Sequence, residues 1–542
     1  MVNGPSPVLS IESLSIGLPA LADRQHAIRN VSLSINPGET LCVVGESGSG
    51  KSMTAMAAIG LLPRGVEVLA GSIRLGGRDL LSLDEAGWCD VRGREVGTVF
   101  QEPMTSLNPV MRVADQIAET FRAHGLLTPA ERERRVLDLL AEVNLPHPEL
   151  IAKAYPHELS GGQRQRVMIA MALALEPKLL IADEPTTALD VTTQAQVLRL
   201  MDNLRRKKGT AVLFITHDFG VVAEIADRVA VLQHGELVEE GTAEEVLTRP
   251  QHPYTRRLLA AVPSLTPPAP KVLAGEPIAL KVDGLTKTYG GHGFFRKGRE
   301  VQAADAVSFS IRRGETLGLV GESGSGKSTV GRCVLRLIEP DGGAIAIGNV
   351  SFGALSQRSL RPHRRKIQMV FQDPFASLNP RRTVGRIIAE GPVTQGESPE
   401  KALDEAKILL EKVGLPAQAV DRYPHEFSGG QRQRIGIARA LAMRPDVLVA
   451  DEAVSALDVS VQAEILKLLK GLQEEFGLAI LFITHDLRVA AQICDRVAVM
   501  QKGRIVEMAE TAQLFAHPRD AYTRQLLAAV PGMNRMIEGD VP

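Results

Sequence analysis

A glycine-rich octapeptide, Gly-Glu-Ser-Gly-Ser-Gly-Lys-Ser, occurs twice in the chain, at residues 45–52 and 321–328. Each copy follows a short apolar run, at 41–44 and 317–320, and each precedes a segment with helical character. A strand, a glycine-rich loop and a helix in this order form a phosphate-binding loop, in which backbone N–H groups and the positive end of the helix meet phosphate oxygens. The sequence therefore predicts two nucleotide sites in an α/β fold.

Each residue type in the loop has a chemical task. The lysine is expected to reach the β- and γ-phosphates of ATP, and the serine after it is expected to ligate Mg²⁺. The glycines let the backbone turn tightly against the phosphates. The loop residues predicted to bind nucleotide are Gly45, Ser47, Gly48, Gly50, Lys51 and Ser52 in the first copy, and Gly321, Ser323, Gly324, Gly326, Lys327, Ser328 and Thr329 in the second.

The repeat extends through the whole chain. Residues 99–103 recur as residues 370–374 in the form Val-Phe-Gln-acid-Pro, and Ser160–Gln163 recurs as Ser428–Gln431. A period this long indicates a duplicated domain rather than a solenoid. A proline-rich stretch between the copies favours an extended spacer. The predicted organisation is a first domain at residues 1–263, a linker at 264–277 and a second domain at 278–542.

Composition limits the class of protein. The 542 residues are too many for one core, and 62 Lys+Arg nearly cancel 63 Asp+Glu, so the charge excess of a nucleic-acid-binding protein is absent. No run of about eighteen apolar residues predicts a membrane span. The N-terminus lacks the basic flank and apolar core of a secretory signal. The four cysteines are scattered without disulfide-framework or zinc spacing.

Apolar patterning places the remaining polar motifs at one edge of a sheet. The helix after the first loop is expected to end near Pro63 and Gly65, and a mostly helical insertion is expected from residue 102 to about 174. Short runs that are apolar on both faces indicate a parallel sheet covered by helices, in which ligands bind beyond the carboxyl ends of the strands. The residues that directly follow such strands are Gln101, Asp183, Glu184 and His217.

These motifs resemble those of the ATP-binding cassette (ABC) superfamily over nearly the whole chain. In the first half, Leu159–Gln163 resembles the signature motif, Leu179–Glu184 resembles Walker B with its catalytic glutamate, and Thr187–Asp190 resembles the D-loop. The second half supplies Ser428–Gln431, Val447–Glu452, Ser455–Asp458 and His485. The resemblance implies two tandem P-loop NTPase cassettes, each with a RecA-like, mostly parallel sheet core, an antiparallel β subdomain and a helical subdomain.

The roles follow from the resemblance and from the chemistry of each residue type. Carboxylates directly after buried strands suit Mg²⁺ held through water, together with hydroxyl and amide oxygens. The metal-binding set is therefore predicted as Ser52, Gln101 and Asp183 in the first half, and Ser328, Gln372 and Asp451 in the second. The catalytic residues are predicted as Glu184 and Glu452, which accept a proton from or orient the attacking water, and His217 and His485, which contact the γ-phosphate.

The signature loop explains why the cassette is duplicated. It opens a helix and so provides a second anion-binding N-terminus. By the resemblance it acts in trans, so that ATP joins the halves head to tail and hydrolysis releases them. Nucleotide bound by the first half would be covered by Ser428, Gly429 and Gly430, and nucleotide bound by the second half by Ser160, Gly161 and Gly162.

Three positions depart from the family pattern. Tyr289 matches the aromatic residue that stacks on adenine, whereas the first half has Leu18 there, with His26 or aliphatic packing left to substitute. Weaker nucleotide binding is therefore predicted at the first site. Phe427 replaces the leucine of the signature and is expected to pack. Ala453 follows the second catalytic glutamate in place of a proline and is expected to loosen the turn without removing chemistry.

Several segments resemble the oligopeptide/dipeptide/nickel importer subfamily, including its fused members, the Yej-type microcin C/peptide importers and the glutathione importers. These segments are residues 101–109, residues 372–380 and the Tyr-Thr-Arg tails. The resemblance implies two transmembrane permease subunits, an extracytoplasmic solute-binding protein, ATP and Mg²⁺ as cofactors, no nucleic acid, and a place at the cytoplasmic face of a bacterial inner membrane. Neither tail contains cysteine, so no iron–sulfur cluster is expected. Met104 and Phe375 are candidates for contact with a permease helix, and buried packing is the competing interpretation.

Two other classes of function remain as alternatives. A soluble tandem cassette acting on ribosomes or DNA would carry a long charged linker or zinc-binding cysteine pairs, and neither is present. Exporters commonly have fused membrane segments. A non-hydrolysing scaffold is disfavoured because Glu184 and Glu452 are both retained.

Overall fold

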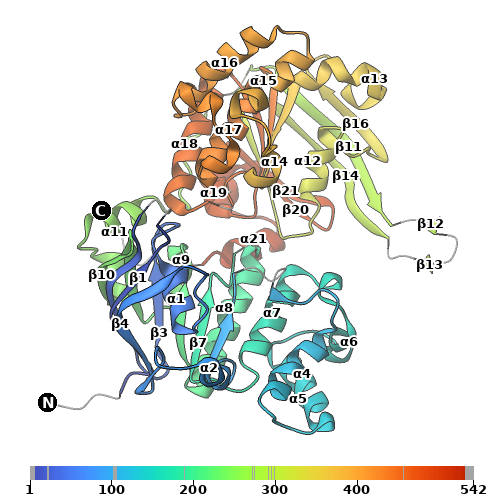
Figure 1. The fold of residues 1–542 in the computed structure, drawn as a ribbon. Helices are drawn as coiled ribbons and strands as arrows, with labels where there is room; N and C mark the ends of the chain where they lie inside the picture. Colours follow the sequence, from blue (N-terminus) through green and yellow to red (C-terminus); the bar gives the residue numbers. More distant parts are fainter. Residues whose placement is uncertain are drawn as a thin grey trace. The chain divides into compact units, whose positions relative to one another are not determined.

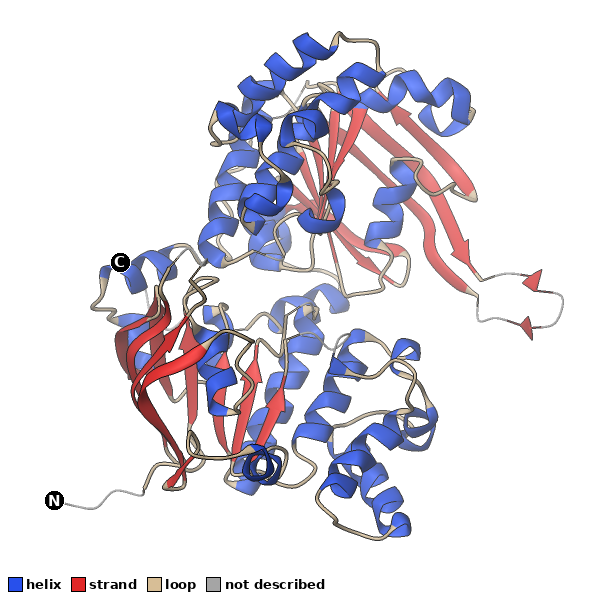
Figure 2. Cartoon of the chain, viewed as in Figure 1, coloured by secondary structure: helices blue, strands red, loops and turns tan. Residues whose placement is uncertain are grey.

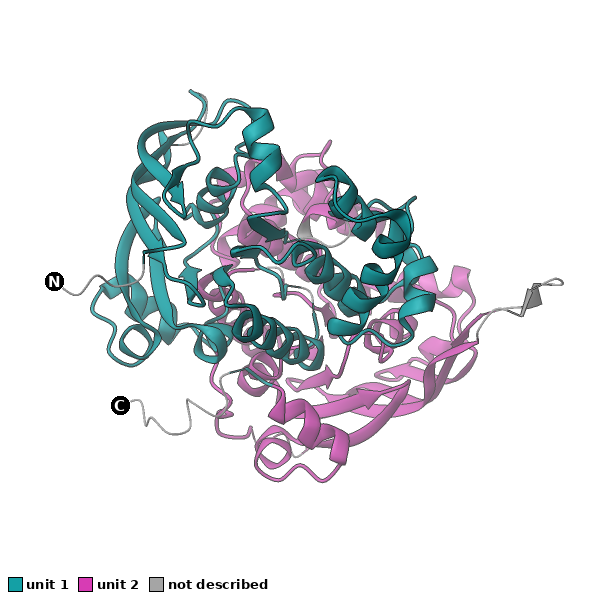
Figure 3. Cartoon of the chain, turned by 90° about the horizontal axis from the view of Figure 1, so that it is seen from below, with its two compact units in different colours: residues 1–262, 530–542 teal, residues 263–529 magenta. Residues whose placement is uncertain are grey.

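The computed structural model describes residues 6–20, 24–101, 106–187, 189–271, 273, 275–290, 292–293, 296–297, 300–455 and 457–531. The chain divides into two compact units, residues 1–262 together with 530–542, and residues 263–529 (Figure 3). No helix in the described part of the chain is long and apolar enough to cross a membrane.

The first unit contains two sheets (Figures 1 and 2). An antiparallel sheet has the order β2-β1-β4-β5, and a six-stranded sheet has the order β10-β9-β3-β8-β7-β6, in which only β9 and β10 pair antiparallel. The strands are β1 (Leu9–Gly17), β2 (His26–Ile35), β3 (Thr40–Val44), β4 (Glu67–Leu75), β5 (Arg78–Asp79), β6 (Val96–Val99), β7 (Leu179–Asp183), β8 (Ala211–Ile215), β9 (Arg228–Gln233) and β10 (Glu236–Thr242).

The helices of the first unit cover the parallel sheet and form the insertion between β6 and β7. They are α1 (Lys51–Ala58), α2 (Glu85–Val91), α4 (Val113–Ala123), α5 (Pro129–Glu142), α6 (Pro148–Lys153), η1 (Pro156–Glu158), α7 (Gly161–Ala172), α8 (Val191–Lys208), α9 (Phe219–Ile225), α10 (Ala243–Thr248) and α11 (Pro253–Ala260). Every residue of β3, β7 and β8 is buried, as two-sided cover requires.

The second unit repeats this plan. Its antiparallel sheet has the order β14-β11-β16, and its six-stranded sheet has the order β17-β18-β19-β15-β20-β21 with the same parallel core. The strands are β11 (Ile278–Tyr289), β12 (His292–Gly293), β13 (Arg296–Lys297), β14 (Val301–Arg312), β15 (Thr316–Val320), β16 (Gly342–Ile347), β17 (Ile367–Val370), β18 (Val447–Asp451), β19 (Ala479–Ile483), β20 (Arg496–Gln501) and β21 (Arg504–Glu510).

The helices of the second unit follow the same order. They are α12 (Lys327–Val334), η2 (Phe352–Ala354), α13 (Gln357–Leu360), η3 (Arg361–Lys366), α14 (Pro374–Ser377), α15 (Val384–Thr394), α16 (Pro399–Lys412), η4 (Ala417–Asp421), η5 (Pro424–Glu426), α17 (Gly429–Leu441), α18 (Val459–Phe476), α19 (Leu487–Ile493), α20 (Thr511–Ala516) and α21 (Ala521–Ala528). The predicted α/β class, with a mostly parallel core, an antiparallel β subdomain and a helical subdomain in each half, is confirmed.

One predicted boundary is wrong. Helix α1 ends at Ala58, several residues before the expected stop near Pro63 and Gly65. Gly60 has a left-handed φ of 65°, and a Cβ at that position would lie 2.4 Å from the ring of Trp88. Gly60 caps the helix, since the Leu61 N–H bonds to the Met56 carbonyl at 2.9 Å, and the indole packs against the chain at the same place.

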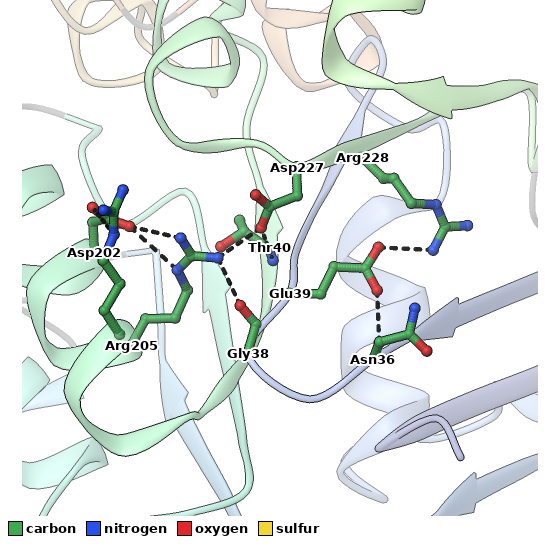
Figure 4. A network of polar contacts seen from close by, with 9 residues as sticks. Asn36, Gly38, Glu39, Thr40, Asp202, Arg205, Asp227 and Arg228 are labelled. Carbon is green, nitrogen blue, oxygen red and sulfur yellow. Dashed lines mark hydrogen bonds and ion pairs between the residues drawn. The ribbon is translucent and has the colours of Figure 1, made fainter. Parts of the chain in front are cut away.

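A polar network fixes the start of β3, at the end of the strand away from the phosphate loop (Figure 4). Asp227 accepts a hydrogen bond from the Thr40 backbone N–H at 2.8 Å and pairs with Arg205 at 2.6 Å. Glu39 pairs with Arg228 at 2.9 Å. These contacts tie β3 to its neighbour β9 and to helix α8, so they hold the strand that delivers the loop.

The second unit keeps this network with one exchange. Asp495 accepts from the Thr316 N–H at 2.8 Å, and Glu315 pairs with Arg496 at 3.0 Å. In place of the arginine of the first unit, Gln473 donates to the Thr316 hydroxyl at 2.6 Å. The side chain of Glu315 is only 1% exposed, so its carboxylate is shielded from water, whereas the Arg496 side chain is 31% exposed.

We expect Glu315→Ala to destabilise the second unit by about 2 kcal/mol, because it removes a buried carboxylate that accepts hydrogen bonds from Arg496 and from the Arg312 N–H. Asp404→Ala removes an exposed pair with Lys407 on α16 and should change stability by no more than about 0.5 kcal/mol. Urea unfolding of both variants measures the difference. Equal destabilisation by the two substitutions would contradict the importance of this network.

Candidate functional site

The phosphate loop of each unit begins where a buried strand ends. In the first unit β3 leads into residues 45–50, and α1 begins at Lys51. Gly50, the residue before the helix, has φ of 104°, and its counterpart Gly326 has φ of 106°. A Cβ on Gly326 would lie 1.9 Å from the carbonyl oxygen of Ala303, so only glycine fits there. The predicted strand–loop–helix arrangement is present in both units.

The two loop lysines are buried and turned onto the loop itself. Lys51 Nζ donates to the carbonyl oxygens of Gly45 at 2.8 Å and Glu46 at 3.0 Å. Lys327 makes the same two bonds in the second unit, to Gly321 and Glu322, both at 2.8 Å. The ammonium group is thus held at the mouth of the loop by backbone oxygens, where a phosphate oxygen would be a stronger partner.

A carboxylate at the end of β7 joins three strand ends of the first unit. Glu184 accepts a hydrogen bond from Gln101 Nε2 at 2.8 Å, and its other oxygen lies 3.1 Å from Nδ1 of His217. Thr187 adds a third bond at 3.0 Å. Since Gln101 follows β6 and His217 follows β8, residues far apart in the sequence converge on one acid at the predicted edge of the sheet.

The second unit builds the same cluster. Glu452 accepts from Gln372 Nε2 at 2.7 Å and lies 3.2 Å from Nδ1 of His485. The two glutamates have matching left-handed φ angles of 46° and 47°. The glutamates thus have the same backbone conformation in both units, and the expectation that Ala453 loosens the turn stays a prediction. Left-handed backbone at a non-glycine residue is uncommon and concentrates at functional sites.

Electrostatics keep these two glutamates ionised. Burial by itself raises the pKa of Glu184, but the hydrogen bond and charge of His217, the charge of Lys51 and the Thr187 bond together lower it to about 2. For Glu452, burial is likewise outweighed by His485 and Lys327, so its pKa is lowered. Burial lowers the pKa of His485, but Glu452 more than compensates and the pKa is raised. An ionised acid beside a histidine can accept a proton or orient a water molecule.

The preceding aspartates have the opposite shift. Burial raises the pKa of Asp183 and Asp451, while hydrogen bonds from Ser52 and Ser328 act in the other direction. Ser328 Oγ lies 3.0 Å from Asp451 Oδ1. Asp183 Oδ1 is buried and has no hydrogen-bond partner. A hydroxyl, a carboxylate and an unsatisfied carboxylate oxygen are hard oxygen donors, and this set fits Mg²⁺.

The signature loops are ready-made helix N-termini. Ser160 accepts from the Gln163 N–H at 3.3 Å, and Gln163 Oε1 accepts from the Ser160 N–H at 2.9 Å, which is a capping box at the start of α7. Ser428 and Gln431 repeat it on α17. Phe427 is buried, as expected, with the guanidinium of Arg422 4.4 Å from its ring centroid.

The antiparallel sheets differ between the units at the position predicted to meet adenine. Tyr289 ends β11 opposite Val301 and is 40% exposed. Leu18 lies at the equivalent position of the first unit, directly after β1, where its N–H donates to the Gln25 carbonyl. Its side chain, in contrast, packs against the buried core. Sequence reasoning missed Arg24, whose guanidinium donates to the carbonyl of Gly48 at the tip of the phosphate loop. Arg24 belongs to no sequence motif, so no signal in the sequence indicated that its guanidinium would contact the loop.

Within each unit the structure thus brings together the loop lysine, the serine, the glutamine, the acidic pair and the histidine. Thr187 makes an added contact to Glu184, the predicted catalytic residue, and sequence reasoning did not assign this contact. Phe375 is 60% exposed, with the guanidinium of Arg432 3.8 Å from its ring centroid. Met104 lies outside the described residues. Coverage of each loop by the signature of the other half stays a prediction.

Comparison with known proteins gives matches to sequence families and to a solved structure. A family model described as ABC transporter matches residues 28–187 and 304–455, together more than half of the chain. A model described as oligopeptide/dipeptide transporter, C-terminal region, matches residues 238–297 and 506–542. Among solved structures, the dimeric ATP-binding cassette MJ0796 bound to ADP and Pi is 32% identical, with a TM-score of 0.39, and covers 43% of this chain and 98% of its own.

Two full-length relatives share the tandem arrangement. The glutathione import ATP-binding protein GsiA of Escherichia coli (strain K12) is 49% identical over 557 residues, which cover 97% of this chain and 89% of the relative. The protein of the same name from Shigella dysenteriae serotype 1 (strain Sd197) is 49% identical over 558 residues, with the same coverage. This chain therefore belongs to the ABC transporter family of ATP-binding proteins and carries the C-terminal region of the oligopeptide/dipeptide transporters in both halves.

Proposed function

We propose that this chain is the ATP-hydrolysing subunit that powers import of peptides or related small solutes through an ABC transporter. The observation that carries the proposal is the intact cluster in both units, in which an ionised glutamate is held by a glutamine and a histidine beside the phosphate loop. A scaffold that only binds nucleotide would not need this cluster twice. The relatives are importer ATPases, which favours this function over a soluble cassette acting on ribosomes or nucleic acid.

ATP would be bound at two composite sites. In each, one half would supply the phosphate loop, the acidic pair and the histidine, and the other half would supply the signature helix. The capping boxes at Ser160 and Ser428 support this arrangement, because they hold the first turn of α7 and α17 with backbone N–H groups available for an anion. Mg²⁺ would be held by Ser52, Asp183 and Gln101, and by Ser328, Asp451 and Gln372, and would neutralise phosphate charge.

The partners would be two transmembrane permease subunits and an extracytoplasmic solute-binding protein, which would place the chain at the cytoplasmic face of an inner membrane. Phe375 on α14 is the exposed apolar residue best suited to contact a permease helix. Glutathione, named in both relatives, is the first solute to test. Co-purification with the permease subunits, followed by a ligand screen on the binding protein, would identify the solute.

Glu184→Gln combined with Glu452→Gln should reduce ATP hydrolysis by about 10²–10⁴-fold while ATP still binds, because the general base is lost and the loop is intact. Steady-state ATPase assays and nucleotide binding measure both effects. Glu236→Gln, which alters an exposed pair with Arg29, is the control and should hydrolyse ATP normally. Normal turnover by the double variant would refute the assignment of the base.

Composite sites predict that a signature residue acts on the loop of the other half. In a Glu452→Gln background, where only the first site should turn over, Ser428→Arg should abolish the remaining ATPase activity by blocking the anion-binding helix end. Ser160→Arg in the same background should leave the first site with most of its activity. The reverse pattern would mean that each half uses its own signature.

The two sites should also differ in affinity for ATP. Tyr289→Ala should weaken binding at the second site by about tenfold, the order expected when an aromatic stack on a base is lost. Leu18→Tyr should strengthen binding at the first site if the new ring turns away from the apolar core, which Leu18 contacts, and stacks on adenine. Titration with a fluorescent nucleotide, with Lys51→Ala or Lys327→Ala silencing the other loop, separates the sites. Unchanged affinity in Tyr289→Ala would rule out adenine stacking there.

A further inference from the structure

Because the domain is duplicated, each contact between its segments occurs twice. One set of ion pairs between two segments differs systematically between the copies. We define the leading segment as the stretch from the start of the sheet-edge strand to the end of the long insertion helix, and the following segment as the stretch from the turn after the signature helix to the end of the next core helix. The leading segments are residues 95–142 and 366–412. The following segments are residues 176–208 and 444–475.

Three ion pairs join the leading and following segments of the first unit. They lie at the entry to strands β6 and β7, between α5 and the turn before β7, and between the ends of α5 and α8. The pairs are Glu95–Lys178 at 3.1 Å, Arg135–Glu176 at 3.5 Å and Glu142–Lys208 at 3.7 Å.

The second unit has three ion pairs at the corresponding places, and every one of them has the opposite polarity. The pairs are Lys366–Asp446 at 3.2 Å, Glu405–Arg444 at 2.7 Å, and Lys412 with Glu475. Where the leading segment of the first unit is acidic, basic and acidic in turn, that of the second is basic, acidic and basic.

The correspondence of positions is structural. Helices α5 and α16 have equal lengths and are capped by Thr128 and Ser398, so Arg135 and Glu405 have the same place in each. The strand pairs β6–β7 and β17–β18 also match in register, since Val96 faces Leu179 as Ile367 faces Val447. Only the last pair is displaced, because Glu475 lies one residue before the end of α18, whereas Lys208 ends α8.

The buried leucines of the junction do not distinguish the halves, although Val136 on α5 is replaced by the smaller Ala406 on α16. The buried leucines of the insertion helix and the core helix are the same residue type in both copies: Leu139, Leu140 and Leu204 in the first, and Leu409, Leu410 and Leu472 in the second. Hydrophobic burial is non-directional, so a leading segment could bury these leucines on either following segment.

We propose that the inverted charges make each leading segment dock on the following segment of its own half and reject that of the other half. If the first leading segment docked on the second core, all three contacts would join like charges: Glu95 with Asp446, Arg135 with Arg444 and Glu142 with Glu475. The reciprocal exchange would be equally unfavourable: Lys366 with Lys178, Glu405 with Glu176 and Lys412 with Lys208. Specificity would thus come from repulsion in the wrong pairing as well as attraction in the right one.

A chain with two similar halves needs a means to prevent segments of one half from docking on the other. Two similar halves in one chain meet at high effective concentration, and exchange of segments is a characteristic failure of repeated domains. An exposed ion pair shifts an equilibrium by only a few-fold, but three pairs that all change sign together favour the correct docking by about tenfold or more.

Four forms of the full-length chain test the proposal. The wild type has opposite polarities in its halves. One variant inverts the second half by Lys366→Glu, Glu405→Arg, Lys412→Glu, Arg444→Glu, Asp446→Lys and Glu475→Lys. Another inverts the first half by Glu95→Lys, Arg135→Glu, Glu142→Lys, Glu176→Arg, Lys178→Asp and Lys208→Glu. The fourth form combines both sets, so its halves are opposite again.

Each form is unfolded in urea and refolded by dilution at low salt, and the fraction that is monomeric and binds ATP is measured. We expect either single inversion to lower this fraction by about threefold or more, since matched polarity then permits exchange within or between chains. The combined form should recover the wild-type fraction. High salt should reduce the differences, because exposed charges are screened.

A matched control separates docking from a general effect of altered charge. Asp404→Lys with Lys407→Asp inverts an ion pair that lies wholly on α16, so the refolded fraction should stay at the wild-type value. If the four forms refold equally, or if the combined inversion adds the losses of the single ones, the pairs act only as local stabilisers and the proposal is wrong. Recovery of the refolded fraction in the combined form separates docking specificity from local stabilisation, even if a single inversion also lowers the free energy of unfolding.

Discussion

Each site depends on a glutamate carboxylate that directly follows the strand next to the sheet edge, β7 in the first unit and β18 in the second. Glu184 accepts hydrogen bonds from Gln101 and Thr187 and contacts His217, and so links the ends of three neighbouring parallel strands. The parallel sheet delivers these side chains to one edge, and the buried aspartate beside the glutamate lies next to the serine of the phosphate loop. The residues predicted to bind phosphate, to hold the metal and to transfer a proton thereby lie together at one edge of the sheet.

The two units show which features the chemistry requires and which it leaves free. The lysine contacts, the glutamine–glutamate–histidine cluster and the capped signature helix are the same in both. The edge predicted to meet adenine differs, because Tyr289 is exposed where Leu18 packs inward. The ion pairs around the helical insertion retain their positions but reverse their signs. The two units thus share the polar contacts around the phosphate loop and differ at the edge of the antiparallel sheet and around the helical insertion.

Much of this could be predicted because the motifs are local. Eight consecutive residues specify the phosphate loop, and a fully apolar strand before Asp183 or Asp451 identifies a buried parallel strand with its acid at the carboxyl end. The helical insertion was predicted from residue 102 to about 174, and α4 to α7 lie within it. The predicted end of the first helix was wrong, because α1 stops at Ala58, where Gly60 takes a left-handed φ and the Leu61 N–H bonds to the Met56 carbonyl.

The sequence by itself determined the duplication, the α/β class and nearly all the residues that lie together around each phosphate loop, because glycine, lysine and paired acids at fixed spacing have few other uses. Only the tertiary structure decided which side chains meet. The inward packing of Leu18, the Arg24 contact with the loop, the Thr187 bond and the three reversed ion pairs all join residues whose separation in the chain carries no pattern. Such contacts depend on how the strands and helices pack, and side-chain packing is a property of the folded chain rather than of any short stretch of it.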